Sequence, residues 1–425
     1  MVYYLFNYLQ KCNFPGAGVF NYVTFRTAAA VILALVISVW FGNWFIKLLK
    51  RKKISESQRD ASIDPYNTKK VGVPTMGGVI IITAILIPVL LVCKLHSVYT
   101  LLMIATTLIL GILGFADDYI KTFKKQKDGL KPAVKLGGQV LLGLIVGLTL
   151  RFSPAVHINE TVHVRIQDNK EIVVKSPDVK STRTTIPFVK NHNLNYADLF
   201  RWAGPKWMYN LAWVFFVLLT VFVVAAVSNG SNLNDGMDGM ASGNSAIIGI
   251  TLVILAYISS NAVTAGHFNL MYIPGSEELV VFLAAFVGAL IGFLWFNSYP
   301  AQIFMGDTGS LTIGGIIAVS AIIMHKELLL PLLCGVFLFE ILSDLDVKRF
   351  VKTGKKHRIW KKGPLHDHFR TSYSDFKKAW PNSTVTFKGS GEGHNSVHHE
   401  VKITIRFWIV TILLAAFTLI TFKIR

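Results

Sequence analysis

Two segments of this chain place carboxylates where they could act on charged substrates. Asp117 and Asp118 are adjacent in the segment GFADDY (114–119), and Asp307 lies in FMGDTGS (304–310). Adjacent carboxylates repel each other unless a cation or a substrate proton stabilises them. Three carboxylates from separate segments suit Mg²⁺, a hard cation that takes oxygen ligands and substrate phosphates. A solvated helix end would explain the first pair alone, and a helix cap would explain Asp307 alone. Taken together, the three predict a magnesium site.

A second motif repeats polar side chains at every third position. Asn229, Asn232, Asp235 and Asp238 are interleaved with glycines in the segment 228–239. A helical turn would bring neighbours in this series together, and glycines let the backbone approach a ligand closely. Amide and carboxylate groups suit the edge of a nucleobase and the hydroxyls of a ribose. A polar turn between helices is the alternative interpretation.

Histidines and lysines in other loops are candidates for binding phosphate or sugar oxygens. His366 and His368 lie in PLHDHF (364–369), within a loop rich in Lys and Arg that offers no cysteine pair for a soft metal. Lys69 and Lys70 precede PTMGG (74–78). Either lysine could bind a phosphate, or could simply be one of the basic residues that mark a cytoplasmic loop. Further along, His394, His398 and His399 lie in a segment of low complexity and are interpreted as incidental.

The composition predicts an all-α polytopic membrane protein that positions these groups. Of the 425 residues, 52% are hydrophobic and 16% are charged, whereas soluble domains carry about 25% charged residues. A helix needs about 20 apolar residues to cross the hydrocarbon core, and ten runs approach this length. They cover approximately residues 25–48, 76–94, 98–116, 134–150, 207–228, 243–260, 278–296, 309–325, 327–344 and 403–422.

Lys and Arg alternate between loops in a way that predicts orientation. The loops after the first, third and ninth runs are basic, while those at 95–97, 261–277 and 326 are short and nearly uncharged. By the positive-inside rule the basic loops are cytoplasmic, and both termini are periplasmic. The formal charge of +19 therefore reflects topology and no nucleic-acid partner is expected. The first run is too long for the apolar region of a signal peptide. Cys93 and Cys334 lie in apolar runs and are expected to be packed thiols.

The whole chain, 1–425, is expected to be one membrane-embedded domain with two insertions. The segment 151–206 between the fourth and fifth runs is long and polar, with β-branched residues that predict a small periplasmic hairpin. The segment 346–402 is predicted to be a cytoplasmic loop, within which the stretch 381–400 is a flexible insertion.

Five motifs in order resemble one family. PTMGG, FADDY, SN-x-x-N-x-x-DG-x-DG, FMGDTGS and PLHDHF are similar to those of the polyprenyl-phosphate N-acetylhexosamine-1-phosphate transferases, with the closest likeness to the branch that transfers phospho-N-acetylmuramoyl-pentapeptide. The resemblance omits most of 152–200 and 381–400. It implies ten membrane helices in the bacterial cytoplasmic membrane, a homodimer and a cleft open to the cytoplasm. It further implies Mg²⁺, UDP-N-acetylmuramoyl-pentapeptide as donor, undecaprenyl phosphate as acceptor and UMP as product, in the synthesis of lipid I for peptidoglycan.

The resemblance also assigns roles to particular residues. Asp117, Asp118 and Asp307 match the essential aspartates, with Asp307 matching a Mg²⁺ ligand. The positions that match the nucleotide or donor site are Lys70, Asn229, Asn232, Asp235, Asp238, Phe304, His366 and His368, with Asn297 beside the catalytic cluster. The lysines expected to meet phosphate oxygens are Lys121, Lys131 and Lys135. Asp367 is a departure, since the family usually has a third histidine there, and this puts the role of the middle position in doubt.

Two other functions compete with this interpretation. A transferase that uses UDP-N-acetylglucosamine would share the chemistry. A transporter would instead carry acidic residues inside its spans, and here they lie at the ends of runs and in loops. For the transferase, direct attack by the lipid phosphate and a covalent phospho-Asp117 intermediate are both compatible with the sequence.

Overall fold

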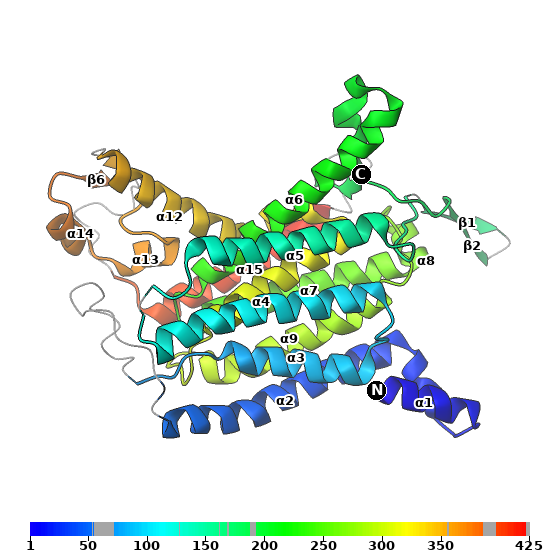
Figure 1. Ribbon diagram of the computed structural model, residues 1–425, viewed down its shortest axis with the longest axis horizontal. Helices are drawn as coiled ribbons and strands as arrows, with labels where there is room; N and C mark the ends of the chain where they lie inside the picture. Colours follow the sequence, from blue (N-terminus) through cyan, green and yellow to red (C-terminus); the bar gives the residue numbers. More distant parts are fainter. Residues whose placement is uncertain are drawn as a thin grey trace.

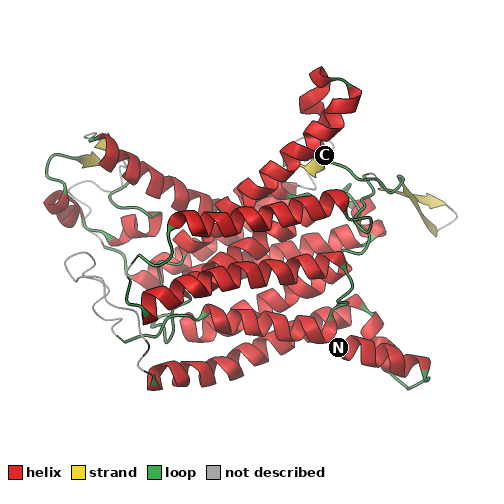
Figure 2. Cartoon of the chain, viewed as in Figure 1, coloured by secondary structure: helices red, strands yellow, loops and turns green. Residues whose placement is uncertain are grey.

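The computed structural model describes residues 1–52, 54, 72–126, 128–160, 162–167, 170–187, 193–354, 357–385 and 397–421. Lys69, Lys70 and His394 lie outside the described residues. The described chain is a bundle of long helices with small sheets at its two ends (Figure 1, Figure 2). The long apolar helices are α2 (Val23–Arg51), α3 (Gly78–Val92), α4 (Val98–Phe123), α5 (Pro132–Phe152), α6 (Pro205–Asn234), α7 (Met240–Ser260), α9 (Glu277–Asn297), α10 (Gly306–Ile323) and α15 (Glu400–Thr421).

Each of the ten predicted runs coincides with a helical segment, and the predicted all-α membrane fold is confirmed. Among the described residues, eight helices are long and apolar enough to cross a membrane, while α3, at 15 residues, is shorter. The run predicted at 327–344 is not one straight helix, so that prediction was wrong in its geometry. It consists of η4 (Glu327–Leu329) with α11 (Leu330–Leu333) and then α12 (Gly335–Thr353), bent by 75° at Cys334. Counted as one span, this bent pair would be the ninth.

The two central helices are α9 and α10, in which nearly every residue is buried. Helix α9 packs against α2, α3 and α7, and α10 packs against α4 and α6. Close packing depends on small residues, as is usual between membrane helices. A Cβ atom on Gly288 would lie 2.4 Å from the carbonyl oxygen of Val31, and one on Gly292 would lie 2.6 Å from the Cβ of Ser38.

One end of the bundle carries the predicted hairpin. Strands β1 (Val162–Gln167) and β2 (Lys170–Lys175) pair antiparallel, with Val162 opposite Lys175. The other elements at this end are β3 (Arg183–Thr185), β4 (Asn193–Asn195), η3 (Tyr196–Ala203), α8 (Ala262–His267), and near the N-terminus α1 (Val2–Lys11) and η1 (Ala17–Asn21). The sequence did not predict α1, which lies at the same end as the hairpin (Figure 1).

The opposite end carries a small subdomain between α12 and α15 (Figure 1). It contains β5 (His357–Arg358) paired parallel with β6 (Thr384–Val385), and the short helices α13 (Leu365–Arg370) and α14 (Tyr373–Ala379). The guanidinium of Arg358 is buried between the rings of Phe350 and Phe376, 4.9 and 4.5 Å from their centroids. Burial lowers the pKa of Arg358 to about 10. Of the stretch 381–400, residues 386–396 lie outside the described part.

A buried ion pair joins two of the long helices near the hairpin end. In α2, Arg26 is fully buried, and its Nη1 donates to both carboxylate oxygens of Glu278, in α9, at 2.7 Å. The backbone N–H of Lys94 donates to the same carboxylate at 2.8 Å. Ionised groups in an apolar bundle need such partners, so this pair fixes α2 against α9.

We expect the change Glu278→Gln to destabilise the bundle by about 3–5 kcal/mol, because it leaves the buried guanidinium of Arg26 without a counter-charge. Thermal unfolding in detergent, followed by tryptophan fluorescence, measures the loss. The matched control is Asp198→Asn, which breaks the exposed pair of Asp198 with Arg201 and should cost no more than about 1 kcal/mol. Equal melting of the two variants would contradict the structural role given to the Arg26–Glu278 pair.

Candidate active site

The predicted acidic cluster forms where α4 crosses the start of α10. The helices approach so closely that a Cβ on Gly114 would lie 2.3 Å from the carbonyl oxygen of Asp307. At the start of α10, Gly306 has a φ of +72°, a conformation that favours glycine. A Cβ on Gly306 would also lie 2.6 Å from Oδ2 of Asp118. The two glycines thus permit the aspartates of both motifs to meet.

The carboxylate of Asp118 receives the first N–H groups of α10. Its Oδ1 accepts from the backbone N–H of Asp307 at 3.0 Å, and its Oδ2 accepts from the backbone N–H and the hydroxyl of Thr308 at 2.9 and 2.5 Å. N–H groups in the first turn of a helix have no partner within the helix. Asp118 therefore acts as a cap supplied by another helix, and it is 4% exposed.

Asp117 and Asp307 share two lysines. The Nζ of Lys121 lies 2.7 Å from Asp117 and 3.4 Å from Asp307, and the Nζ of Lys135 lies 2.9 Å from Asp117 and 2.5 Å from Asp307. The backbone N–H of Leu130 also donates to Asp117, at 2.6 Å. The two ammonium groups thus bridge two carboxylates from different helices. Both lysines are partly exposed, at 25% and 18% of their side chains, so the cluster is accessible from outside the bundle.

The three carboxylates fit a divalent cation. One oxygen from each of Asp117, Asp118 and Asp307 lies within 4.8 Å of the other two. Since Asp118 already receives three hydrogen bonds from α10, the carboxylates best placed to hold a cation are those of Asp117 and Asp307. Mg²⁺ is commonly held by one or two carboxylates together with substrate phosphates. The donor set, all oxygen and close to two lysines, agrees with that chemistry.

The polar series predicted in segment 228–239 begins inside a helix. Helix α6 continues through Asn234, beyond the predicted end of the run at 228, so Asn229 and Asn232 lie on its last turns. The side chain of Asn229 donates to Gln139 at 3.0 Å, and Asn232 accepts from Ser310 at 3.1 Å. The sequence reasoning missed Gln139, whose amide also donates to the hydroxyl of Ser228 at 2.7 Å. A lone Gln in the apolar run 134–150 was the available signal.

The second half of the series is a turn held from two sides. The carboxylate of Asp238 accepts from the backbone N–H of Ala301 at 3.0 Å. Beside it, Asn297 accepts from the backbone N–H of Gly239 at 3.2 Å and donates to the carbonyl of Ile303 at 3.0 Å. These bonds fix the turn before α7 against the segment that leads to Asp307.

The histidine motif lies against this turn. A Cβ on Gly236 would lie 2.0 Å from Nε2 of His366, and Nδ1 of His366 lies 3.1 Å from both oxygens of Glu340 in α12. Burial alone would lower the pKa of His366, but the charge and hydrogen bond of Glu340 outweigh it and raise that pKa above its ordinary value. The sequence reasoning missed Glu340, although an acidic residue within the apolar run 327–344 was a signal.

The other two members of the motif have different surroundings. Burial lowers the pKa of His368 to about 4, with Lys361 and Arg358 adding to the effect, and its Nδ1 accepts from the backbone N–H of Lys361 at 3.0 Å. Burial would raise the pKa of Asp367, but His366, Arg370 and Lys362 hold it below its ordinary value. The carboxylate of Asp367 lies 2.7 Å from Arg370 and 3.1 Å from Lys362. The position where the family usually has histidine is thus an anion paired with two cations.

The structure places the remaining predicted residues as follows. Phe304 is half-buried, and its backbone bonds with Pro74 and Gly77 at 2.9 and 2.8 Å join the segment 74–78 to the segment before α10. Asp235 directly follows α6. Lys131 is exposed at the start of α5, one turn before Lys135, and is not part of the ion-pair cluster described above.

Comparisons with known proteins agree on one family. Residues 100–325, which carry the aspartate cluster and the polar series, match the family described as glycosyl transferase family 4. The chain is 62% identical to a protein of Phocaeicola vulgatus, 61% to one of Bacteroides fragilis and 50% to one of Porphyromonas gingivalis, in each case over the full length of both chains. All three relatives are named phospho-N-acetylmuramoyl-pentapeptide-transferase. With this likeness over its whole length, the chain belongs to the family of phospho-N-acetylmuramoyl-pentapeptide transferases.

Proposed function

We propose that this enzyme transfers phospho-N-acetylmuramoyl-pentapeptide from UDP-N-acetylmuramoyl-pentapeptide to undecaprenyl phosphate, giving lipid I and UMP. The observation that carries the proposal is the cluster of Asp117, Asp307, Lys121 and Lys135 at one end of an apolar bundle. The two lysines can pair with substrate phosphates, and the two carboxylates can hold the metal ion that a diphosphate binds. The apolar bundle supplies a surface for the polyprenyl tail.

The membrane topology is part of the same proposal. The basic segment 121–135 contributes Lys121 and Lys135 to the aspartate cluster, and the positive-inside rule would place that end of the bundle, with α13 and α14, in the cytoplasm. The hairpin end then faces the periplasm. Water-soluble UDP-sugar and membrane-bound acceptor would therefore meet at the inner surface of the cytoplasmic membrane. The homodimer is also proposed, on the family resemblance alone.

In the proposed reaction, an oxygen of the lipid phosphate attacks the β-phosphorus of the donor, and the bond from that phosphorus to the oxygen of UMP breaks. The ammonium groups of Lys121 and Lys135 neutralise phosphate oxygens as charge shifts toward UMP. Asp117 orients the lipid phosphate or accepts its proton. Asp307 and Asp117 would hold Mg²⁺, which would supply positive charge to offset that of the diphosphate. Such transfer depends on positioning and on electrostatic stabilisation prepared in advance.

The donor's uridine and sugar would lie against the polar series and the histidine motif. Asn229, Asn232 and Asp235, on and just after the last turns of α6, are the proposed contacts for the nucleotide, with Phe304 and Lys70. His366, whose pKa Glu340 raises, would donate from Nε2 to a phosphate or sugar oxygen. Asp238 and Asn297 would act through the backbone, since their bonds hold the loops that carry the other groups.

Donor choice tests the proposal directly. Purified protein supplied with undecaprenyl phosphate and Mg²⁺ should release UMP from UDP-N-acetylmuramoyl-pentapeptide and not from UDP-N-acetylglucosamine. The variant Asp307→Ala should lose on the order of 10²–10³ in kcat, the loss typical when one group that stabilises transition-state charge is removed. Release from UDP-N-acetylglucosamine would move the enzyme to the sister activity, and release from neither donor would overturn the proposal.

The two adjacent aspartates should behave differently when each is changed to asparagine. Asp117→Asn should lower kcat by roughly 10²–10⁴ with a smaller change in thermal stability, because Lys121 and Lys135 are partly exposed and keep Asp307 as a counter-ion. Asp118→Asn should also lower the stability by about 1–3 kcal/mol, because an amide has one acceptor oxygen and would leave a buried donor at the start of α10 without a partner. Parallel melting curves and UMP assays measure both quantities. Equal stabilities of the two variants would contradict the capping role of Asp118.

A separate experiment distinguishes the two routes of transfer. If phosphorylated Asp117 can be trapped when donor is supplied without acceptor lipid, the reaction proceeds through a covalent intermediate and not by direct transfer.

Replacing Glu340, the hydrogen-bond partner of His366, should change how kcat/KM depends on pH. The raised pKa keeps His366 protonated to higher pH than an isolated histidine, so Glu340→Gln should lower that pKa. If the protonated form binds substrate, the alkaline limb of kcat/KM against pH should move to lower pH in the variant, and Glu340→Asp should restore part of the shift. An unchanged alkaline limb with reduced activity at every pH would give Glu340 a purely structural role.

A further inference from the structure

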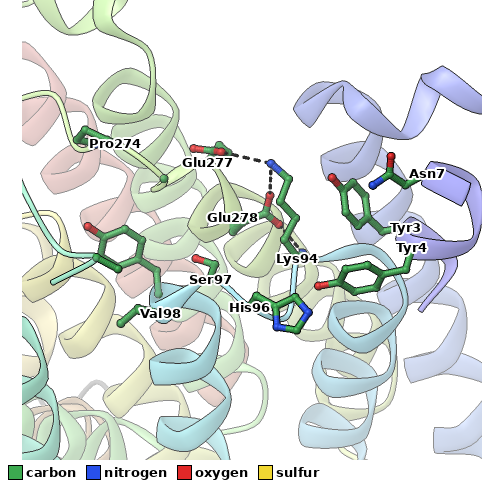
Figure 3. A pocket seen from close by; sticks show the side chains of 13 residues that line it. Tyr3, Tyr4, Asn7, Lys94, His96, Ser97, Val98, Pro274, Glu277 and Glu278 are labelled. Carbon is green, nitrogen blue, oxygen red and sulfur yellow. Dashed lines mark hydrogen bonds and ion pairs between the residues drawn. The ribbon is translucent and has the colours of Figure 1, made fainter. Parts of the chain in front are cut away.

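A cavity lies at the end of the bundle opposite the aspartate cluster. It has a volume of about 420 Å³ and is enclosed by α1, the link between α3 and α4, and the start of α9. Figure 3 shows Lys94 reaching toward Glu277 and Glu278 on one side, with Tyr3, Tyr4 and Asn7 of α1 on the other. The volume falls in the range of small-molecule sites, about 300–1,000 Å³, and the reaction proposed above makes no use of this end.

Among the polar groups that line the cavity, Glu277 is an accessible acid and Lys94 an accessible base. The carboxylate of Glu278 is buried against Arg26 at 2.7 Å and also lies 3.6 Å from the Nζ of Lys94. The carboxylate of Glu277 remains 29% exposed, and its ion pair with Lys94 is long, at 3.5 Å. Lys94 itself is 38% exposed, and His96 lies two residues further on in the lining. Partly exposed pairs at this distance contribute little, so both groups can exchange their partner for a ligand.

An unpartnered hydroxyl points to a ligand independently of these charges. Tyr99 lines the cavity and is 3% exposed, yet its hydroxyl makes no hydrogen bond among the described residues. A buried hydroxyl without a partner costs about 1–3 kcal/mol. A polar atom of a bound molecule would remove that cost.

The helix over the cavity is suited to a membrane surface. Helix α1 docks on the α3–α4 link, where the hydroxyl of Tyr4 accepts from the backbone N–H of Leu95 at 2.8 Å. Its outward side exposes Leu5 and Tyr8, at 56% and 65%. A short amphipathic helix with exposed apolar residues lies in the plane of the interface between headgroups and acyl chains. Lipid headgroups are therefore the molecules nearest to the mouth of the cavity.

We propose that this cavity binds the head group of a phospholipid that carries both a phosphate and a primary ammonium. The ammonium would pair with Glu277, and the phosphate would pair with Lys94 and accept from the hydroxyl of Tyr99. A zwitterion fits because the acid Glu277 lies beside the base Lys94, so a purely anionic head group would meet the repulsion of Glu277. With the orientation proposed above, the lipid belongs to the periplasmic leaflet, but its binding does not depend on the transferase activity.

The test is lipid binding to the purified full-length protein, measured by native mass spectrometry with phosphatidylethanolamine, phosphatidylglycerol or phosphatidylcholine added at equal concentration. One phosphatidylethanolamine should be retained per chain, at least tenfold more tightly than phosphatidylglycerol. Glu277→Gln and Tyr99→Phe should each weaken its retention several-fold. The matched control Asp198→Asn removes an exposed acid at the same end and should retain lipid like the wild type. Melting temperature and UMP release, measured on the same samples, establish that each variant is folded.

Several outcomes would overturn the proposal. Equal retention by the wild type and by Glu277→Gln or Tyr99→Phe would place the lipid elsewhere on the protein. Phosphatidylglycerol bound as tightly as phosphatidylethanolamine would exclude recognition of the ammonium. Phosphatidylcholine bound as tightly would exclude a primary ammonium that donates hydrogen bonds. Free phosphoethanolamine that displaces the lipid at micromolar concentration would assign the cavity to a soluble ligand.

Discussion

The active site depends on the contact between the carboxylate of Asp118 and the start of α10. That helix begins inside the bundle, where water cannot satisfy its first N–H groups. The N-cap position of α10 is occupied by Met305, whose side chain makes no capping hydrogen bond. Because α4 supplies the carboxylate instead, the first turn of α10 is free to present Asp307 toward Lys121 and Lys135. The glycines at 114 and 306 provide the space that this arrangement requires.

Once the first turn of α10 is held in this way, charge neutrality explains the rest of the cluster. Asp117 and Asp307 would repel each other across the crossing of α4 and α10 without cations between them. Lys121 comes from α4 and Lys135 from α5, so the ion pairs join three helices at one point. Substrate phosphates can bind the two lysines, and a divalent cation can bind the two carboxylates. Each lysine or carboxylate then exchanges one ionic partner for another, so no buried charge is left unpaired. The groups that hold the resting structure together are in this sense also those that bind substrate.

The sequence predicted the apolar helices and the ordering of the motifs because both depend on local composition. It predicted that Asp117, Asp118 and Asp307 act together, but not that Asp118 caps α10, since a cap from another helix leaves no local pattern. Glu340 and Gln139 were missed for the same reason. Each is a polar residue within a largely apolar run, and its partner, His366 or Asn229, lies far away in the chain. The 75° bend at Cys334 was also missed, because hydropathy reports the length of an apolar run and not its direction.

Ion pairs at the two ends of the bundle differ in how accessible their cations are. At the hairpin end, Arg26 and Glu278 are bonded to each other at 2.7 Å and are inaccessible, so no ligand can replace either partner. At the other end, the lysines of the aspartate cluster remain partly exposed and each is shared by two carboxylates. A shared, accessible cation can be redirected to a phosphate at small cost, whereas a buried, inaccessible cation such as Arg26 cannot. Exposure of the cation, more than the presence of an ion pair, therefore distinguishes the group that can bind substrate from the group that holds helices together.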